Sequence, residues 1–205
     1  MIGVVVGPPG SGKGTQAELI AADLGVPHVS TGELLRAEAA AGTPLGREVA
    51  PLLAAGELVP DELLDRLVEQ RLAAADGGPG AILDGYPRTI PQARTLDSRL
   101  PATGHRVDFV LVLEVEEATL LRRLLDRAAT EHRADDNPTS IAERLAEYRQ
   151  VTEPLIDHYR AEGVPVLSID GTGPVDTVHA RILRALTAAG LLRRAGRESK
   201  GGSAR

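Results

Sequence analysis

The residues from Gly7 to Thr15 have the types and the spacing needed to bind a polyphosphate. Gly7, Gly12 and Lys13 supply the pattern G-x-x-x-x-G-K, with a further glycine at position 10. Glycines let a backbone curl and approach an anion closely, and the lysine adds a positive charge for the terminal phosphates. A glycine-rich turn with an incidental lysine is the alternative interpretation. The sequence on either side of the loop decides between the two.

The loop is flanked by a strand pattern and a helix pattern. Residues 2–6 are apolar and rich in β-branched side chains, which predicts a buried strand. Apolar residues then recur at helical spacing over residues 13–24, and Gly25 stops the helix. The loop amides and the N-terminus of that helix would converge on one point, which favours a phosphate-binding loop.

Asp84 is the candidate residue for a magnesium ion. It ends the apolar run 81–84, which predicts a strand of a parallel sheet, and the carboxyl ends of such strands line the ligand crevice. Alone, an aspartate in this position is more often a turn residue. The phosphate loop itself departs from the general pattern, because Gly14 follows the lysine and the hydroxyl comes only at Thr15.

Four arginines in the second half of the chain are candidate phosphate ligands. Arg123 and Arg127 are four residues apart on a predicted helix and therefore share a face. Arg133 falls in a short predicted loop, and Arg144 falls in the helix after it. The alternative is a set of solvated arginines paired with Glu117, Asp126 or Glu147, which we favour for Arg122, Arg149 and Arg160.

Strand and helix patterns alternate along the chain. Strands are predicted over residues 2–6, 26–29, 81–84, 107–115 and 164–169. Helices are predicted over about 13–24, 30–42, 44–55, 60–72, 90–100, 116–127, 138–161 and 175–189, the long one capped by Asn137 and bent near Pro154. This order predicts a single α/β domain over residues 1–192, with a five-stranded parallel sheet covered by helices on both faces. Residues 193–205 are polar, Gly/Ser-rich and basic, which predicts a disordered tail.

Composition excludes several classes of function. The 205 residues carry a formal charge of −6, which argues against a nucleic-acid or membrane surface. One Phe, three Tyr and no Trp leave no aromatic platform for single-stranded nucleic acid. The chain has no cysteine, so we expect no disulfide and no thiolate zinc site. Met1 leads directly into the first strand without a signal peptide, and a cytoplasmic location is expected.

Four strings together resemble the adenylate kinases, a family of nucleoside monophosphate kinases, in their short-lid form. They are the loop in the form G-x-P-G-S-G-K-G-T-Q, residues 30–36 (STGELLR), residues 84–92 (DGYPRTIPQ) and the arginine-bearing stretches 122–127, 133–137 and 143–148. The resemblance runs from Met1 to about Ala189. It implies a fold like that of the P-loop nucleoside triphosphate hydrolases, with a mobile AMP-binding insert at 30–59 and a short lid at about 128–137. Ala128 and His132 depart from the family, whose members often have glycine there.

The activity implied by this resemblance is the reversible, magnesium-dependent transfer of the terminal phosphoryl group of ATP to AMP, which gives two ADP and serves adenine nucleotide homeostasis. The implied partners are ATP, AMP and ADP with Mg²⁺. We expect no zinc, nucleic acid or membrane, and a monomer is the default because no exposed apolar helix stripe is evident. The implied catalytic residues are Lys13, Arg88, Arg123, Arg133 and Arg144. The implied ATP-binding residues are Gly10, Ser11, Gly12, Lys13, Gly14, Thr15, Arg123, Arg127 and Gly173. The implied AMP-binding residues are Thr31, Arg36, Glu57, Leu58, Val59, Gly85, Tyr86, Pro87, Arg88, Gln92, Arg133 and Arg144, and Asp84 would hold magnesium through water.

Two other functions remain open at this point. A pyrimidine monophosphate kinase would share the loop, Asp84 and the arginines, and Gln92 is the discriminator because an amide can donate to and accept from the adenine edge at once. A non-catalytic nucleotide-binding module is disfavoured by the retention of Lys13, Asp84 and the arginines. Phosphoryl transfer needs positioning and charge neutralisation rather than a general base. The scattered histidines are accordingly interpreted as surface or satisfied residues; they are His28, His105, His132, His158 and His179.

Overall fold

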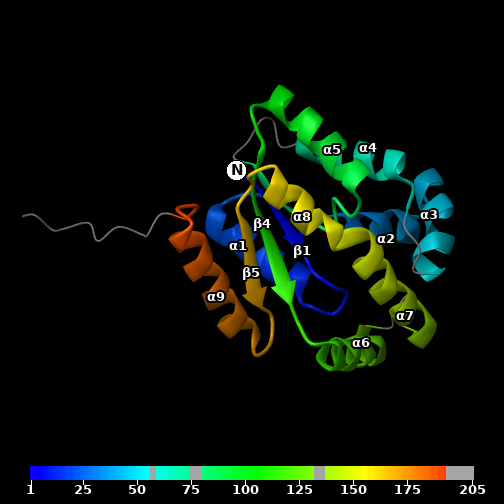
Figure 1. Ribbon diagram of the computed structural model, residues 1–205. Helices are drawn as coiled ribbons and strands as arrows, with labels where there is room; N and C mark the ends of the chain where they lie inside the picture. The colour runs from blue at the N-terminus through cyan, green and yellow to red at the C-terminus, as the bar shows by residue number, and fades with distance from the viewer. Residues whose placement is uncertain (56–58, 74–79, 132–136, 193–205) are drawn as a thin grey trace, which may run out of the picture.

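The chain folds into a five-stranded parallel sheet with helices on both faces, as the computed structural model shows (Figure 1). The structure describes residues 1–55, 59–73, 80–131 and 137–192. The strands are β1 Ile2–Val6, β2 His28–Ser30, β3 Ala81–Asp84, β4 Val107–Glu114 and β5 Val166–Asp170. They lie in the order β2-β3-β1-β4-β5, and every neighbouring pair is parallel. The predicted α/β class and the five-stranded parallel sheet are confirmed.

Two strands begin later than the sequence pattern predicted, and a proline explains each shift. The predictions were 26–29 and 164–169, whereas β2 and β5 begin at His28 and Val166. Pro27 and Pro165 have no N–H to donate to a neighbouring strand. Their carbonyl oxygens still accept from the N–H groups of Ile82 and Val110, at 2.9 Å each. Regular pairing therefore starts one residue after each proline. Strand β4 begins at Val107 as predicted and ends at Glu114, one residue before the predicted end.

Helices cover the two faces of the sheet unequally (Figure 1). Two helices, α1 Lys13–Leu24 and α9 Val175–Ala188, pack on one face, where Ile20 and Ile182 join Phe109 of β4 in one apolar cluster. The other face is covered by α2 Thr31–Ala41, α3 Pro44–Ala55, α4 Asp61–Ala73, α5 Ile90–Arg99 and α8 Pro154–Ala161. A short 3₁₀ helix, Leu100–Thr103, follows α5. Because both faces are covered, β1, β3 and β4 are largely apolar, and their charged residues, Asp84, Asp108 and Glu114, lie at or next to a strand end.

Helices α6 Glu117–Glu131 and α7 Pro138–Glu147 form a separate apolar contact away from the sheet. Leu120 and Leu124 of α6 pack with Ile141 and Leu145 of α7. The predicted end of α6 at residue 127 was wrong, because the helix continues to Glu131. The first part of the predicted lid, residues 128–131, is therefore helical. Residues 132–136 lie outside the described residues.

The single long helix predicted over residues 138–161 is two helices joined by a π-helical turn. Asn137 caps α7 as predicted, because its side chain accepts a hydrogen bond from the Ser140 N–H at 3.0 Å. The π turn spans Tyr148–Thr152 and is followed by α8, which starts at Pro154. The N–H of Glu153 donates to the Tyr148 carbonyl at 2.8 Å, an i→i−5 bond. Pro154 has no N–H and crowds the carbonyl four residues before it, so the helix widens just ahead of the proline.

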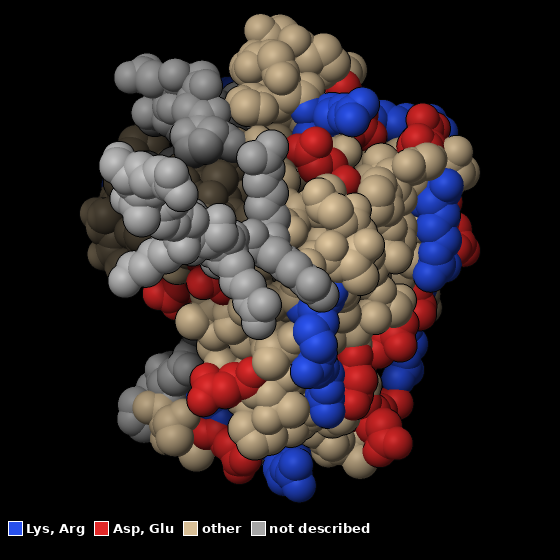
Figure 2. All heavy atoms as spheres, turned by 90° about the vertical axis from the view of Figure 1, so that its left-hand side faces the viewer, with Lys and Arg blue, Asp and Glu red and all other residues tan. Residues whose placement is uncertain are grey.

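The described residues contain no candidate membrane span, and one face of the molecule carries charges of both signs. Within residues 1–55, 59–73, 80–131 and 137–192, no helix is both long enough and apolar enough to cross a bilayer. The face turned to the viewer in Figure 2 is the side on which α9 lies, and its basic and acidic side chains are interspersed.

Candidate active site

A cationic cleft lies at the carboxyl ends of β1 and β3. Its larger cavity measures about 360 Å³, and a smaller one of about 90 Å³ shares Lys13, Gly85, Arg88 and Arg144 with it. Three carboxylates and six cationic side chains line the larger cavity. They are Glu18, Glu33 and Asp84, and Lys13, Arg36, Arg88, Arg123, Arg127 and Arg144. This excess of positive charge suits a multiply charged anion such as a polyphosphate.

The loop between β1 and α1 is shaped by two glycines that play different parts. Gly10 and Gly12 have φ values of 81° and 92°, which side chains other than glycine rarely adopt. A Cβ on Gly10 would lie 2.9 Å from Cγ of Leu124 in α6, so Gly10 permits close packing. A Cβ on Gly12 would meet nothing within 4 Å, so Gly12 borders the space in front of α1. The loop thus leaves the N-terminus of α1 open to a ligand.

Lys13 is the first residue of α1, and its ammonium turns back over the loop. Nζ donates a hydrogen bond to the Pro8 carbonyl at 2.9 Å. Burial lowers the pKa of Lys13 to about 8; Asp84 opposes this effect, whereas Arg88 and Arg144 add to it. A bound polyphosphate would supply the negative charge that the ammonium lacks here. A phosphate in the cleft would therefore stabilise the protonated form of Lys13.

Asp84 lies at the end of β3, level with Ser30 of β2 and Val5 of β1. Its Oδ2 accepts a hydrogen bond from Ser30 Oγ at 3.4 Å and lies 4.0 Å from His28 Nε2. The same oxygen is 3.4 Å from the position that a Cβ on Gly14 would take, so it borders the phosphate loop. Nowhere in the described part of the chain do three or more His, Asp or Glu side chains gather as a metal cage. One carboxylate beside a phosphate site fits Mg²⁺, which keeps several waters.

Arg123 joins helix α6 to two loops at one side of the cleft. Its guanidinium donates to the carbonyl of Gly171 at 3.1 Å, and to those of Ser11 and Gly10 at 3.4 and 3.5 Å. Arg127, one turn further along α6, lines the same cavity. The predicted shared face of the two arginines is therefore found.

The other side of the cleft is formed by the segment after β3. Gly85 has a φ of 78°, and its carbonyl accepts from Thr31 Oγ1 at 3.0 Å and from Arg88 Nε at 2.8 Å. Arg36 folds back over α2, where its guanidinium lies 3.2 Å from the position of a Cβ on Gly32. The hydroxyl of the buried Tyr86 donates to Asp65 of α4, and burial, together with this bond, raises the pKa of Tyr86.

Gln92, in the first turn of α5, is completely buried, and its amide is held by two protein groups. Oε1 accepts from the Arg88 N–H at 2.7 Å, and Nε2 donates to Asp61 Oδ1 at 2.6 Å. Thr89 caps α5 by accepting from the Gln92 N–H at 3.1 Å, and its hydroxyl donates to Asp61 Oδ2 at 3.3 Å. The first turn of α4 is thus joined to the segment 88–92 by side-chain hydrogen bonds.

Comparison with known proteins gives the family. The family model described as adenylate kinase matches residues 5–164. Curated proteins named adenylate kinase align over 183 residues, which is 89% of this chain: from Thermobifida fusca (45% identical, 96% of that protein), Nocardia farcinica (48%, 97%) and Thermus thermophilus (47%, 95%). The chain belongs to the adenylate kinase family. Its enzyme class is therefore ATP:AMP phosphotransferase, as the resemblance implied.

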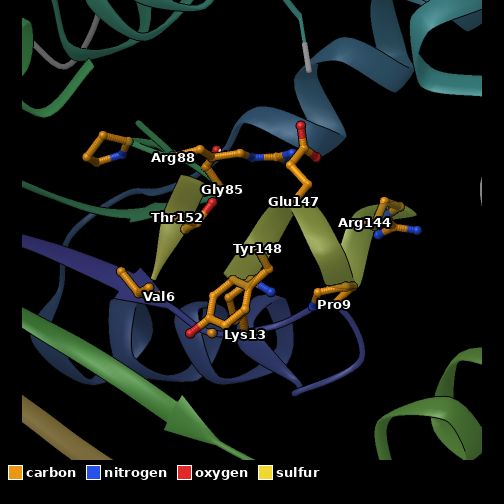
Figure 3. A pocket seen from close by; sticks show the side chains of 11 residues that line it. Val6, Pro9, Lys13, Gly85, Arg88, Arg144, Glu147, Tyr148 and Thr152 are labelled. Atoms are coloured by element: carbon orange, nitrogen blue, oxygen red, sulfur yellow. Dashed lines mark hydrogen bonds between the residues drawn. The ribbon is translucent and has the colours of Figure 1, made fainter. Parts of the chain in front are cut away.

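The adenylate kinase site also contains residues that the sequence did not assign to it. One of them, Glu147, was interpreted only as a possible partner of a solvated arginine. Asp61 and Asp65 were noted only as part of a predicted helix, and no local pattern signals their partners. Glu147, Tyr148 and Thr152 line the smaller cavity with Lys13, and Figure 3 shows Glu147 pointing toward Arg88. Burial raises the pKa of Tyr148 to about 12. The signal that could have revealed this last group is Pro154, since the widened turn before it carries Tyr148.

The residues implied by the resemblance fall into four groups. Those that line the larger cavity are Gly10, Gly12, Lys13, Gly14, Thr15, Arg36, Asp84, Gly85, Arg88, Arg123, Arg127 and Arg144, and Pro87 lines the smaller one. Those buried beside the cleft are Ser11, Thr31, Val59, Tyr86 and Gln92. Gly173 lies after β5, outside both cavities, with a φ of 104°. Glu57, Leu58 and Arg133 lie outside the described residues.

The other charged residues were interpreted with mixed success. Arg149 pairs with Glu117 as predicted, and Arg160 pairs with Asp157 at 3.0 Å. His179 Nε2 pairs with Asp23 at 2.8 Å, but its buried Nδ1 makes no hydrogen bond within the described residues. The expectation was wrong for His28 and His158, because each buries an Nε2 that makes no hydrogen bond within the described residues. These nitrogens lie 4.0 Å from Asp84 and 3.8 Å from Asp97.

Proposed function

We propose that ATP binds to the phosphate-loop side of this cleft and AMP to the side formed by residues 84–92, with Lys13 acting on the phosphoryl group between them. The reaction is the reversible conversion of MgATP and AMP into two ADP. One observation carries this arrangement: six cationic side chains converge on one cavity, and they come from the loop, from α2, from the segment after β3, and from α6 and α7. The triphosphate of ATP and the phosphate of AMP are both negatively charged, so bringing them together needs positive charge on both sides.

On the donor side, the amides of residues 10–15 and the N-terminus of α1 hold the triphosphate. Arg123 and Arg127 neutralise its charge from α6. From the family resemblance, we assign the backbone at Gly173 to the donor adenine. Membership of the family implies that ATP is used with magnesium. We assign the ion to Asp84 through water, where it would neutralise and orient the phosphate oxygens.

On the acceptor side, Arg88 and Arg36 bind the phosphate of AMP, and Arg144 reaches the transferring group. Thr31 and Tyr86 hold the segment that carries Arg88 in place. The Gln92 amide reads the adenine edge. The remaining members of this proposed set are Val59, Gly85 and Pro87, together with Glu57, Leu58 and Arg133 beyond the described residues.

The transfer itself needs no general base. The attacking oxygen belongs to the phosphate of AMP, which is largely dianionic at neutral pH because its second pKa is about 6. The protein positions the two phosphates and neutralises the charge that develops between them. Water competes as a nucleophile, so segments 30–59 and 128–137 close over the substrates before transfer. We further propose that the chain acts as a monomer in the cytoplasm, where all three nucleotides occur.

The direct test gives the purified protein magnesium and ADP as its only nucleotide. Equal amounts of ATP and AMP should appear, and chelation of magnesium should stop the reaction. With ATP as donor, AMP should be a better acceptor than UMP or CMP. The Lys13→Met protein, prepared in the same way, controls for contaminating kinases. No formation of ATP from ADP, or equal use of UMP and AMP, would contradict the proposal.

A further inference from the structure

Helix α4 reaches the acceptor side of the cleft with two carboxylates that lie one turn apart. Asp65 accepts a hydrogen bond from the Tyr86 hydroxyl, and Asp61 accepts from both the Gln92 amide and the Thr89 hydroxyl. The contact between Asp61 and Gln92 joins residues 31 positions apart in the chain. None of the strings that carry the family resemblance contains Asp61.

The partners of Gln92 determine which way round its amide lies. A carboxylate can only accept hydrogen bonds, and a backbone N–H can only donate. Nε2 must therefore face Asp61, at 2.6 Å, and Oε1 must face the Arg88 N–H, at 2.7 Å. If the amide turned over, its oxygen would face the carboxylate and its NH₂ group would face the N–H of Arg88. Both hydrogen bonds would be replaced by repulsive contacts inside a buried site, where unpaired polar groups are costly.

We propose that Asp61 is a positioning residue that makes the acceptor site selective for a 6-aminopurine over a 6-oxopurine. The inference rests on the proposed function, in which Gln92 meets the acceptor base. The two contacts leave the amide one N–H and one lone pair of Oε1. Adenine presents a donor at N6 and an acceptor at N1, whereas hypoxanthine presents an acceptor at O6 and a donor at N1. One orientation of the amide fits adenine, and the reversed orientation fits hypoxanthine.

Without Asp61, the orientation of the amide depends on the single bond to the Arg88 N–H. Turning the amide over then breaks one hydrogen bond to the protein instead of two. A bound 6-oxopurine would form two hydrogen bonds with the turned amide. A site discriminates strongly between two bases when it leaves polar groups of the wrong base without hydrogen bonds. This discrimination is lost when a side chain of the site can reorient to pair with the wrong base. Gln92 is completely buried in this structure. Binding of the base therefore requires a rearrangement that exposes the amide and leaves its contact with Asp61 in place.

The test compares Asp61→Ala with Asp65→Ala, the same substitution one turn further along α4. For each protein, kcat/KM is measured with AMP and with IMP, and KM is measured for ATP. Asp61→Ala should lower the AMP-to-IMP ratio of kcat/KM by about tenfold or more, because it removes a charge-assisted hydrogen bond, and should leave the KM for ATP within about twofold. Asp65→Ala breaks the contact with Tyr86 instead, so the AMP-to-IMP ratio should stay within about twofold of that of the unchanged protein. Asp61→Asn keeps one acceptor oxygen and should give an intermediate ratio, about threefold below that of the unchanged protein.

Gln92→Ala separates failure of this inference from failure of the proposed function. If Gln92→Ala lowers the ratio and Asp61→Ala does not, Gln92 reads the base without help from Asp61, and the inference is wrong. An equal fall in Asp65→Ala would mean that loosening α4 is enough, which also overturns it. If Gln92→Ala leaves the ratio unchanged, the place of Gln92 in the proposed function is wrong and the inference falls with it. Should Asp61→Ala melt below the assay temperature, an Asp61→Asn ratio equal to that of the unchanged protein overturns the inference.

Discussion

The two sides of the cleft are built in different ways. On the donor side, a continuous stretch of backbone over residues 7–15 turns through two glycines with positive φ into the N-terminus of α1. On the acceptor side, side chains from three separated regions meet: Thr31 from α2, Asp61 and Asp65 from α4, and the segment 84–92. The donor side depends on backbone geometry, whereas the acceptor side depends on matched hydrogen-bond partners. Substitutions on the two sides should therefore impair nucleotide binding for different physical reasons.

The largest effect is expected at the point where the two sides meet. Lys13→Met should lower kcat by about a thousandfold or more, equivalent to ~4 kcal/mol of transition-state stabilisation, because it removes the ammonium next to the transferring phosphate. The fold should persist, since the Nζ–Pro8 bond is one contact of a well-packed loop. Turnover is measured with a coupled assay, and thermal melting serves as the control. A rate within tenfold of that of the unchanged protein would remove Lys13 from its catalytic role.

A smaller effect should separate the two glycines of the donor side. Both Gly10→Ala and Gly12→Ala place a side chain at positive φ, at a cost of about 1–2 kcal/mol each. Only at Gly10 does the new Cβ meet protein, 2.9 Å from Leu124 Cγ and 3.1 Å from the Leu120 carbonyl. Gly10→Ala should therefore lower the free energy of unfolding by about 1–2 kcal/mol more than Gly12→Ala, as measured in urea.

Gly12→Ala should show the opposite balance. A Cβ on residue 12 meets no protein atom within 4 Å, and the triphosphate is proposed to lie in this open space in front of α1. Gly12→Ala should therefore raise the dissociation constant for ATP, and it should lower the free energy of unfolding less than Gly10→Ala does. Equal losses of stability in the two variants would mean that α6 does not hold the loop as described.

The difference between the two sides also explains which parts of the fold and of the site could be predicted from the sequence. The donor loop could be predicted because its residues are neighbours in the chain and their types follow directly from the geometry of an anion site. The alternation of strands and helices gave the sheet for the same local reason. The predicted starts of β2 and β5 were each two residues too early, since the apolar pattern includes Pro27 and Pro165 although neither can donate to a neighbouring strand.

Contacts between distant residues could not be predicted from local patterns. Gln92 was expected to pair with the adenine edge, and no local pattern indicates that its amide is also held by Asp61 of α4 and by the Arg88 N–H. The π turn Tyr148–Thr152 interrupts a helix whose apolar spacing is continuous on either side of it. His28 was interpreted as satisfied or exposed, yet pairing of β2 with β3 places it near Asp84. The contacts of Gln92 and His28 depend on helix packing and strand register, whereas the π turn follows from Pro154, a local feature whose effect the apolar spacing does not reveal.

The central claim is that the two sides bind different nucleotides, and two arginines test it most directly. Arg88→Ala and Arg123→Ala are titrated calorimetrically with AMP and with a non-hydrolysable ATP analogue, and the adjacent exposed Arg122→Ala serves as the control. Arg88→Ala should raise the dissociation constant for AMP by about tenfold or more and that for the analogue by less than about threefold, because charge-assisted bonds to a phosphate are lost on one side only. Arg123→Ala should give the reverse pattern. Equal losses for both ligands in both variants, or an exchanged pattern, would contradict the separation of donor and acceptor sides.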